Sequence, residues 1–404
     1  MKYIVVLGDG MADYEVAEFN SNTILDVADK PNMDYMASFG EMGLVKTVGD
    51  GMKPGSDVAN LSVMGYDTRK CYSGRSPLEA ASVGVKLKDT DVTFRANLVT
   101  LSDEENYEDK TMLDYSAGEI STDEARELIL AVNKELHTDV HTFYPGISYR
   151  HLLVWDKGSV NVKLTPPHDI SDKKIAGHLP EGDGADILLD FMKKSEKILK
   201  NHPVNQKRIK EGKRPATSIW LWGEGTKPNL ENFYEKYAKK GSVISAVDLI
   251  KGIAILSGMT SIDVEGANGN HDTNYKGKAD ACFDALTKDG QDMVYIHLEG
   301  PDECGHRGEA DNKKYAVEMI DKKVIGYLRE KFEKAGIDYK MMVLPDHPTP
   351  IKLKTHVSDP VPYIIYDSTK ETEDKKVKYS EKEAKKTGIF VEKGFELMAH
   401  FLAL

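Results

Sequence analysis

Three acidic residues in this chain follow short apolar runs, and each is placed where a buried strand would end. They are Asp9, after the run 3–7; Asp302, after the run 293–298; and Asp346, after the run 341–344. The carboxyl ends of parallel strands meet at one edge of an α/β sheet, which is where such proteins bind ligands. Carboxylates gathered at that edge would bind a divalent cation, although Asp9 alone also suits an ordinary turn.

Histidines accompany the last two of these strand ends. His306 is four residues after Asp302, a spacing at which both side chains reach one cation if the turn is helical or tight. His347 is adjacent to Asp346, and His356 follows shortly afterwards. A plain loop would explain any one of these pairs, but their agreement favours mixed oxygen and nitrogen ligands for two metal ions.

Ser56 is the candidate nucleophile. It begins the stretch SDVANLSVM after Gly55, and the apolar positions that follow predict a helix with Ser56 at its N-terminus. Free backbone N–H groups and the helix dipole make that position suitable for a phosphate, and a nearby metal would activate the serine oxygen. The alternative is that Ser56 or Asp57 only caps the helix.

Composition narrows the class of protein. The 404 residues carry a formal net charge of −12, and no basic block is long enough to bind nucleic acid. No apolar run is long enough to span a bilayer, and nothing resembles a signal peptide, so we expect a cytoplasmic protein without a membrane partner. Cys71, Cys282 and Cys304 fit reduced thiols, and Cys304 is expected to be a buried thiol rather than a zinc ligand. The oligomeric state stays open.

Strand and helix patterns alternate along most of the chain, which predicts an α/β fold. From about residue 89 the sequence pattern changes to that of a strand, a helix and a strand among polar loops. We therefore predict a core of residues 1–88 and 175–404 with a smaller inserted domain at 89–174. The run 219–222 is expected to return to the core sheet, and the basic segment 207–214 is expected to be a solvated loop. Arg95, Arg150 and His151 could face a cleft, or could lie on the surface.

The ordered motifs resemble the cofactor-independent phosphoglycerate mutases of the archaeal type, in the alkaline phosphatase superfamily. Those motifs, which cover nearly the whole chain, are Asp9, GSDVANLSVMGYD (55–67), YSGRSPLEAASVGV (72–85), HDTNYKGKADA (271–281), DECGH (302–306), PDH (345–347) and the later TH (355–356). The resemblance implies a doubly wound alkaline-phosphatase-like core with an inserted α+β cap domain. It also implies interconversion of 3-phosphoglycerate and 2-phosphoglycerate through a phosphoserine.

The same resemblance implies roles for individual residues. Ser56 would be phosphorylated, and the divalent ions would be manganese, with zinc or magnesium as alternatives. One ion would be held by Asp9, Ser56, Asp346 and His347, and the other by Asp302, His306 and His356. Arg150, Lys276 and Arg75 are candidates for binding the substrate carboxylate and phosphate, although Lys276 could equally be a solvated loop lysine.

Other acceptors for the phosphoryl group stay open. A homoserine kinase-like phosphotransferase would need a phosphoryl donor, and no P-loop motif is present. A phosphomonoesterase would pass the group from Ser56 to water. A non-catalytic protein on the same scaffold is disfavoured because all seven predicted site residues are retained.

Overall fold

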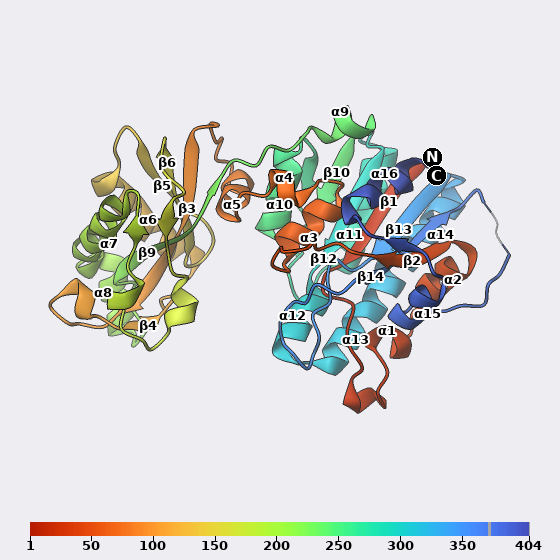
Figure 1. Ribbon diagram of the computed structural model, residues 1–404, viewed down its shortest axis with the longest axis horizontal. Helices are drawn as coiled ribbons and strands as arrows, with labels where there is room; N and C mark the ends of the chain where they lie inside the picture. The colour runs from red at the N-terminus through yellow and green to blue at the C-terminus, as the bar shows by residue number, and fades with distance from the viewer. Residues whose placement is uncertain (371–372, 404) are drawn as a thin grey trace. The chain divides into compact units, whose positions relative to one another are not determined.

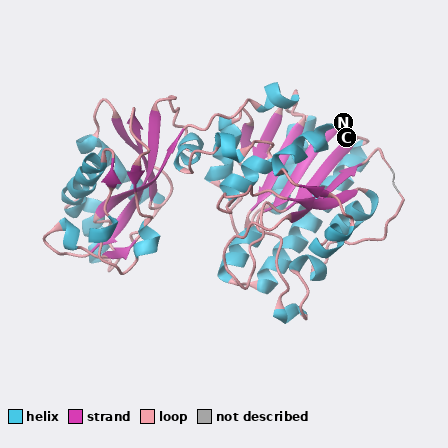
Figure 2. Cartoon of the chain, viewed as in Figure 1, coloured by secondary structure: helices cyan, strands magenta, loops and turns pink. Residues whose placement is uncertain are grey.

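The computed structural model describes residues 1–370 and 373–403, which form two compact units. The first unit comprises Met1–Tyr72 and Asn229–Leu404, and the second comprises Ser73–Pro228. Each unit contains its own sheet and its own helices (Figure 2). The α/β fold class and the insertion of one unit into the other along the chain agree with the sequence prediction.

An eight-stranded sheet forms the centre of the first unit (Figure 1). Its strands, in spatial order, are β11 (Thr260–Ile262), β10 (Gly241–Ile244), β12 (Met293–Leu298), β1 (Lys2–Gly8), β13 (Tyr339–Leu344), β14 (Val361–Asp367), β2 (Glu41–Val45) and β15 (Phe390–Val391). The strand β1 pairs in parallel with β12 and with β13, and every residue of β12 and β13 is buried. The three predicted strand ends therefore meet at one edge of the sheet.

Helices cover both faces of this sheet. They are α1 (Ile24–Val27), α2 (Pro31–Phe39), α3 (Ser56–Val63), α4 (Thr68–Cys71), α9 (Phe233–Tyr237), α10 (Asp248–Leu256), α11 (Tyr275–Thr287), α12 (Gly300–Arg307), α13 (Ala310–Met319), α14 (Tyr327–Ala335), α15 (Glu381–Lys386) and α16 (Leu397–Ala403), with a π-helical segment at Ile320–Gly326. Ile4 packs with α2, α11 and α14 in one core cluster. Strand residues alternate between faces, so Tyr3 packs on Phe401 of α16 and Tyr295 donates to Asn60 of α3. This is the doubly wound arrangement that the sequence predicted.

The second unit is wider than the predicted insert. Its strands are β3 (Asp91–Leu101), β4 (Met112–Asp114), β5 (His141–Tyr144), β6 (Arg150–Asp156), β7 (Val162–Lys163), β8 (Glu181–Gly182) and β9 (Ser218–Thr226), and its helices are α5 (Ser76–Ser82), α6 (Thr122–Leu136), α7 (Ala185–Lys200) and α8 (Pro203–Lys210). The boundaries 89–174 are wrong because β9 pairs antiparallel with β3 instead of joining the core sheet. Helix α7 also shares the hydrophobic core of this unit. A short apolar strand does not reveal its pairing partner, which is a long-range property.

The prediction that residues 207–214 form a solvated loop is also wrong in part. Arg208 lies on α8 with its side chain 3% exposed, and its guanidinium binds Glu124 at 2.7 Å. The same group donates to the carbonyl oxygens of Arg214 and Ala117. A buried arginine with these partners joins α8 to the start of α6, so this part of the basic segment is structural.

Candidate metal centre and active site

Ser56 is the first residue of α3, as the sequence predicted; Gly55 occupies the N-cap position, so Ser56 is not the capping residue. Its Oγ instead lies 3.3 Å from Nε2 of His347. Asn60, one turn later, donates to the carbonyl oxygen of Ser56 at 2.8 Å and to Oδ2 of Asp346 at 2.9 Å. The start of α3 is therefore tied to the end of β13, and the hydroxyl of Ser56 points to the histidine rather than to its own helix.

The first cluster joins Ser56 to Asp9, Asp346 and His347, which have exposed fractions of 1% or less. His347 Nε2 is 3.3 Å from Oδ2 of Asp346 and 3.7 Å from Oδ1 of Asp9. Asp346 Oδ1 accepts from the backbone N–H groups of Gly10 and His347, which fixes its orientation. Ligand atoms of the two carboxylates and the imidazole lie within 4.8 Å of one another, close enough to converge on one cation.

The second cluster is built on α12 and on the loop after β13. Asp302 and His306 are one helical turn apart on α12, with Oδ2 and Nε2 separated by 3.3 Å. Nε2 of His356 is 3.4 Å from Oδ1 of Asp302 and 2.8 Å from Nε2 of His306. Because Nδ1 of His306 lies 3.0 Å from the carbonyl oxygen of Lys354, which can only accept, that nitrogen carries a proton and Nε2 faces the cluster.

The two clusters are neighbours. The rings of His347 and His356 have centroids 4.1 Å apart, and Thr349 contacts both Asp302 and His347 through its hydroxyl. All seven residues that sequence analysis assigned to metal binding therefore lie in one continuous site of the first unit. Two adjacent groups of potential metal ligands therefore lie beside the hydroxyl of Ser56.

The buried carboxylates of the site give it an electrostatic environment that favours cations. Burial, together with the charges of Asp346 and Asp302, raises the pKa of Asp9 well above its ordinary value. Within the described residues, Oδ1 of Asp9 is buried and has no hydrogen-bond donor. Burial opposes ionisation of Asp302 as well, but hydrogen bonds from His306 and His356 hold the pKa of that carboxyl well below its usual range. A buried acceptor without a donor beside like charges is a position that a cation would stabilise.

Sequence analysis missed the residues that support this site. His297 is fully buried in β12, where its Nε2 lies 2.9 Å from Oδ2 of Asp9 and its Nδ1 lies 3.2 Å from Oγ of Ser245. Lys278 donates to the carbonyl oxygen of His297 at 2.9 Å, and burial lowers its pKa to about 8. The signal was available: a histidine interrupts an otherwise apolar buried strand, one residue before the sheet edge.

The three residues predicted to bind substrate are divided between the two units. The side chain of Lys276 on α11 is 62% exposed and pairs with Asp280 at 2.6 Å. Arg75 and Arg150 belong to the second unit, and both are exposed. Burial lowers the pKa of Arg95, the charge of Glu79 opposes that shift, and the positive charges of Arg75 and Arg150 add to it. The second unit therefore gathers three arginines near one another.

His151, the other candidate for facing a cleft, is instead 1% exposed within β6. Its Nδ1 accepts from the backbone N–H of Gly146 at 3.0 Å. Burial lowers its pKa to about 3, so the ring is neutral at physiological pH. His151 is therefore part of the core of the second unit.

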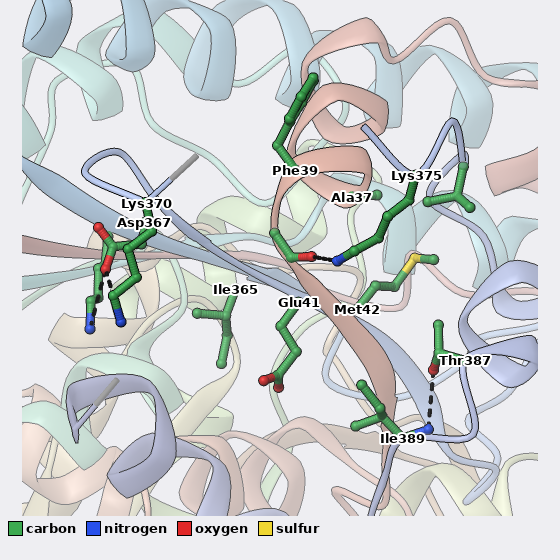
Figure 3. A pocket seen from close by; sticks show the side chains of 13 residues that line it. Ala37, Phe39, Glu41, Met42, Ile365, Asp367, Lys370, Lys375, Thr387 and Ile389 are labelled. Atoms are coloured by element: carbon green, nitrogen blue, oxygen red, sulfur yellow. Dashed lines mark hydrogen bonds and ion pairs between the residues drawn. The ribbon is translucent and has the colours of Figure 1, made fainter. Parts of the chain in front are cut away.

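A cavity of about 540 Å³ lies elsewhere in the first unit (Figure 3). Its lining comes from the end of α2, the start of β2 and the end of β14, and includes Met42, Ile365 and Lys375. Lys340 lines it near the start of β13, whereas Asp346 and His347 follow the end of that strand. The cavity is thus at the opposite sheet edge from the candidate metal ligands. Its lining is mostly apolar, so it is not part of the candidate metal site.

Comparison with family models identifies two regions of the chain. Residues 37–205 match the model described as 2,3-bisphosphoglycerate-independent phosphoglycerate mutase. Residues 173–353 match the model described as type I phosphodiesterase / nucleotide pyrophosphatase. These residues include most of the second unit and, in the second match, the helix α12 and both strand ends at Asp302 and Asp346.

Curated relatives match along the whole chain. A probable 2,3-bisphosphoglycerate-independent phosphoglycerate mutase of Geobacter sulfurreducens is 49% identical, with 100% of each chain covered. A 2,3-bisphosphoglycerate-independent phosphoglycerate mutase of Methanosarcina barkeri is 48% identical, with 98% of each covered.

Two solved structures share the fold. The PH0037 protein from Pyrococcus horikoshii aligns with a TM-score of 0.83 at 30% identity, covering 100% of this chain and 96% of that one. The cofactor-independent phosphoglycerate mutase from Thermoplasma acidophilum aligns with a TM-score of 0.66 at 24% identity and full coverage of both chains. The alkaline-phosphatase-like core that the sequence predicted is confirmed. Among the described residues, no helix combines the length and apolar character needed to cross a membrane.

Proposed function

We propose that this chain, which belongs to the family of 2,3-bisphosphoglycerate-independent phosphoglycerate mutases, interconverts 3-phosphoglycerate and 2-phosphoglycerate by carrying the phosphoryl group on Ser56. The residues around Ser56 would hold two divalent cations. The activity is that of the family. The observation that carries the proposed route is the position of Ser56 Oγ, 3.3 Å from His347 within a ligand set that also contains Asp9 and Asp346.

The residues present suit the two cations. Asp9, Ser56, Asp346 and His347 would hold one, and Asp302, His306 and His356 would hold the other. When bound, the cations would neutralise the phosphoryl oxygens and lower the pKa of the serine hydroxyl. Manganese is the proposed ion, with zinc or magnesium as alternatives, because carboxylate and imidazole ligands accept all three.

Ser56 Oγ would attack the phosphorus of 3-phosphoglycerate, forming a phosphoserine as the bond to the substrate oxygen breaks. The N-terminus of α3, with the positive end of its helix dipole, would face the transferred group. Asn60 holds the Ser56 carbonyl and the Asp346 carboxylate, so nucleophile and ligand keep a fixed relation. The glycerate would then reorient and accept the group on its other hydroxyl, which frees Ser56.

Arg75 and Arg150 are proposed to bind the anionic groups of the substrate. Both are close enough to Arg95 to affect its pKa, so positive charge is concentrated there, and arginine binds carboxylate and phosphate through paired hydrogen bonds. Lys276 was proposed for the same role from the sequence. Its ion pair with Asp280 and its position over the ring of Tyr327 favour a surface role instead.

The proposed substrate is small and phosphorylated, and the net charge of −12 supports a protein that does not bind nucleic acid. A cytoplasmic location is proposed from the cysteines, since Cys71, Cys282 and Cys304 are all free thiols.

To test the mechanism, the purified protein is assayed with Mn²⁺ and 3-phosphoglycerate, without added bisphosphoglycerate. We expect 2-phosphoglycerate to form without release of inorganic phosphate, and Ser56→Ala to lower kcat by about 10⁴-fold or more. Release of phosphate would indicate a phosphatase, and a requirement for ATP and homoserine would indicate the kinase alternative. Full activity in Ser56→Ala would rule out the phosphoserine.

A further inference from the structure

A third group of potential metal ligands lies on the other side of α12 from the catalytic candidates. Ligand atoms of His271, Cys304 and Glu309 lie within 4.8 Å of one another. They come from three segments: the loop before α11, the middle of α12, and the residue before α13. None of them belongs to the two ligand sets described above.

The burial and the hydrogen bonding of these three side chains favour the binding of an ion. The Cys304 side chain is fully buried, whereas Glu309 is 36% exposed, so an ion can enter from solvent at the glutamate. Nδ1 of His271 is buried and makes no hydrogen bond with any described residue. A buried ring nitrogen without a partner is costly unless something binds it.

The guanidinium of Arg307 lies beside this group and supplies a positive charge there. Its Nε binds Glu309 at 3.1 Å, and its Nη2 lies 3.8 Å from Sγ of Cys304. The same guanidinium also donates from Nη1 to Glu303 and to Asn270, at 3.1 and 3.3 Å. A cation at the cluster would displace Arg307 from Glu309 while leaving it these two other partners.

We propose that His271, Cys304 and Glu309 form a third divalent metal site, selective for thiophilic ions such as Zn²⁺, with water completing the coordination. Thiolate, imidazole and carboxylate are the donors that zinc prefers, and three protein ligands with one open position are a common arrangement. On binding, the Cys304 thiol loses its proton to solvent and its sulfur becomes the ligand. No electron transfer is involved.

The site would secure the helix that carries Asp302 and His306. The loop with His271 already lies against the first turn of α12, where a side chain at Gly300 would come within 3.0 Å of His271 Cα. A metal would join this loop to α12 and to the start of α13 by direct bonds. The third site is thus proposed as structural, separate from the phosphoryl-transfer chemistry.

Cobalt provides a direct test, because only thiolate ligands produce a sulfur-to-cobalt charge-transfer band in the near ultraviolet. The catalytic ligands proposed above are oxygen and nitrogen atoms only, so the band reports Cys304 whatever the mutase activity proves to be. We expect Co²⁺ added to the metal-free full chain to produce the band, and Cys304→Ser to lack it. Cys282→Ser, which removes another buried thiol, is the matched control and should retain the band.

Variants at the other ligands give the direction of the effect. His271→Gln and Glu309→Gln should raise the cobalt concentration at half-saturation by about tenfold or more, since even outer-sphere partners contribute that much. Arg307→Gln should lower it, because a competing positive charge is removed, and simple structural damage would not tighten binding. Far-ultraviolet circular dichroism checks that each variant is folded. Absence of the band in the wild type, or its persistence in Cys304→Ser, would overturn the proposal.

Discussion

At the scale of single residues, the proposed metal ligands depend on side chains that do not themselves face the cations. His297 is the clearest case, because it lies between Asp9 and Ser245 inside the sheet. The distance from Nε2 to the Asp9 carboxylate permits a hydrogen bond that sets the orientation of the ligand. Partners of this kind raise metal affinity by fixing the geometry of the ligand before the ion arrives.

Replacement of His297 tests that role. We expect His297→Ala to raise the Mn²⁺ concentration needed for half-maximal activity by about 10- to 100-fold, while kcat at saturating metal stays within a few-fold of the wild type. Titration of activity against Mn²⁺ measures both quantities. Ser245→Ala, which removes the more distant partner, should have a smaller effect. An unchanged metal requirement in His297→Ala would show that Asp9 is positioned without it.

At the scale of elements, the site is assembled by connections between segments far apart in the chain. A fully buried ion pair joins Lys313 on α13 to Asp13 after β1, with 2.6 Å between Nζ and Oδ2. Lys313 also donates to the carbonyl oxygens of Ala12 and Thr349, and Asp13 accepts from the backbone N–H of Ile351. The pair therefore holds α13 against two loops that leave the sheet edge next to the metal ligands.

Breaking this pair should be costly, because it leaves an uncompensated buried charge. We expect Lys313→Met to lower the free energy of unfolding by about 3–5 kcal/mol. Urea denaturation followed by circular dichroism measures the change. The double variant Lys313→Met with Asp13→Leu removes both charges and should recover much of the loss. If the double variant were as unstable as the single one, packing rather than charge would explain the effect.

The second unit has its own pH dependence, through His151 in β6. Its pKa is about 3 when folded, against an ordinary value of 6.5, because burial disfavours the charged ring. The unfolded chain therefore binds a proton that the folded one does not, so stability is lost as pH falls from about 6.5 towards 3, by about 1.4 kcal/mol per pH unit.

His151→Gln removes the titrating ring and should reduce this loss. The comparison is made by urea unfolding at pH 7 and at pH 4.5, with tryptophan fluorescence as the signal. The variant is expected to be less stable at pH 7, since a packed ring is lost, but to lose less stability on acidification. An identical pH dependence in both proteins would mean that His151 does not control the acid sensitivity of this unit.

At the scale of the whole molecule, the proposed metal ligands and the tryptophans lie in different units. Every proposed metal ligand lies in the first unit, whereas all three tryptophans, Trp155, Trp220 and Trp222, lie in the second. Tryptophan fluorescence therefore reports the unfolding of the second unit, and circular dichroism reports both. This division makes the effect of metal on each unit measurable in the intact chain.

Metal removal should destabilise the first unit selectively. A ligand present at about 100 times its Kd stabilises the folded state by about 2.7 kcal/mol. We expect a chelator to lower the thermal transition seen by circular dichroism while leaving the tryptophan transition in place. Restoring Mn²⁺ is the control. Equal shifts in both signals would show that the two units unfold together.

The sequence alone determined the features that depend on local pattern. The runs at 293–298 and 341–344 predicted β12 and β13, and the turn before Ser56 predicted the start of α3. Apolar runs and helix starts depend only on residues that are close together in the sequence. The spacing of Asp302 and His306 likewise predicted that one helical turn would bring them together. These local features were sufficient to indicate the site and its chemistry.

Tertiary structure decided what depends on contacts between distant residues. Pairing of β9 with β3 moved the domain boundary, and burial made His151 a core residue. The approach of His271 and Glu309 to Cys304 turned an isolated thiol into a potential metal ligand. Sequence spacing constrains only residues that share a turn or a strand, whereas these outcomes follow from which segments pack against each other to bury apolar surface.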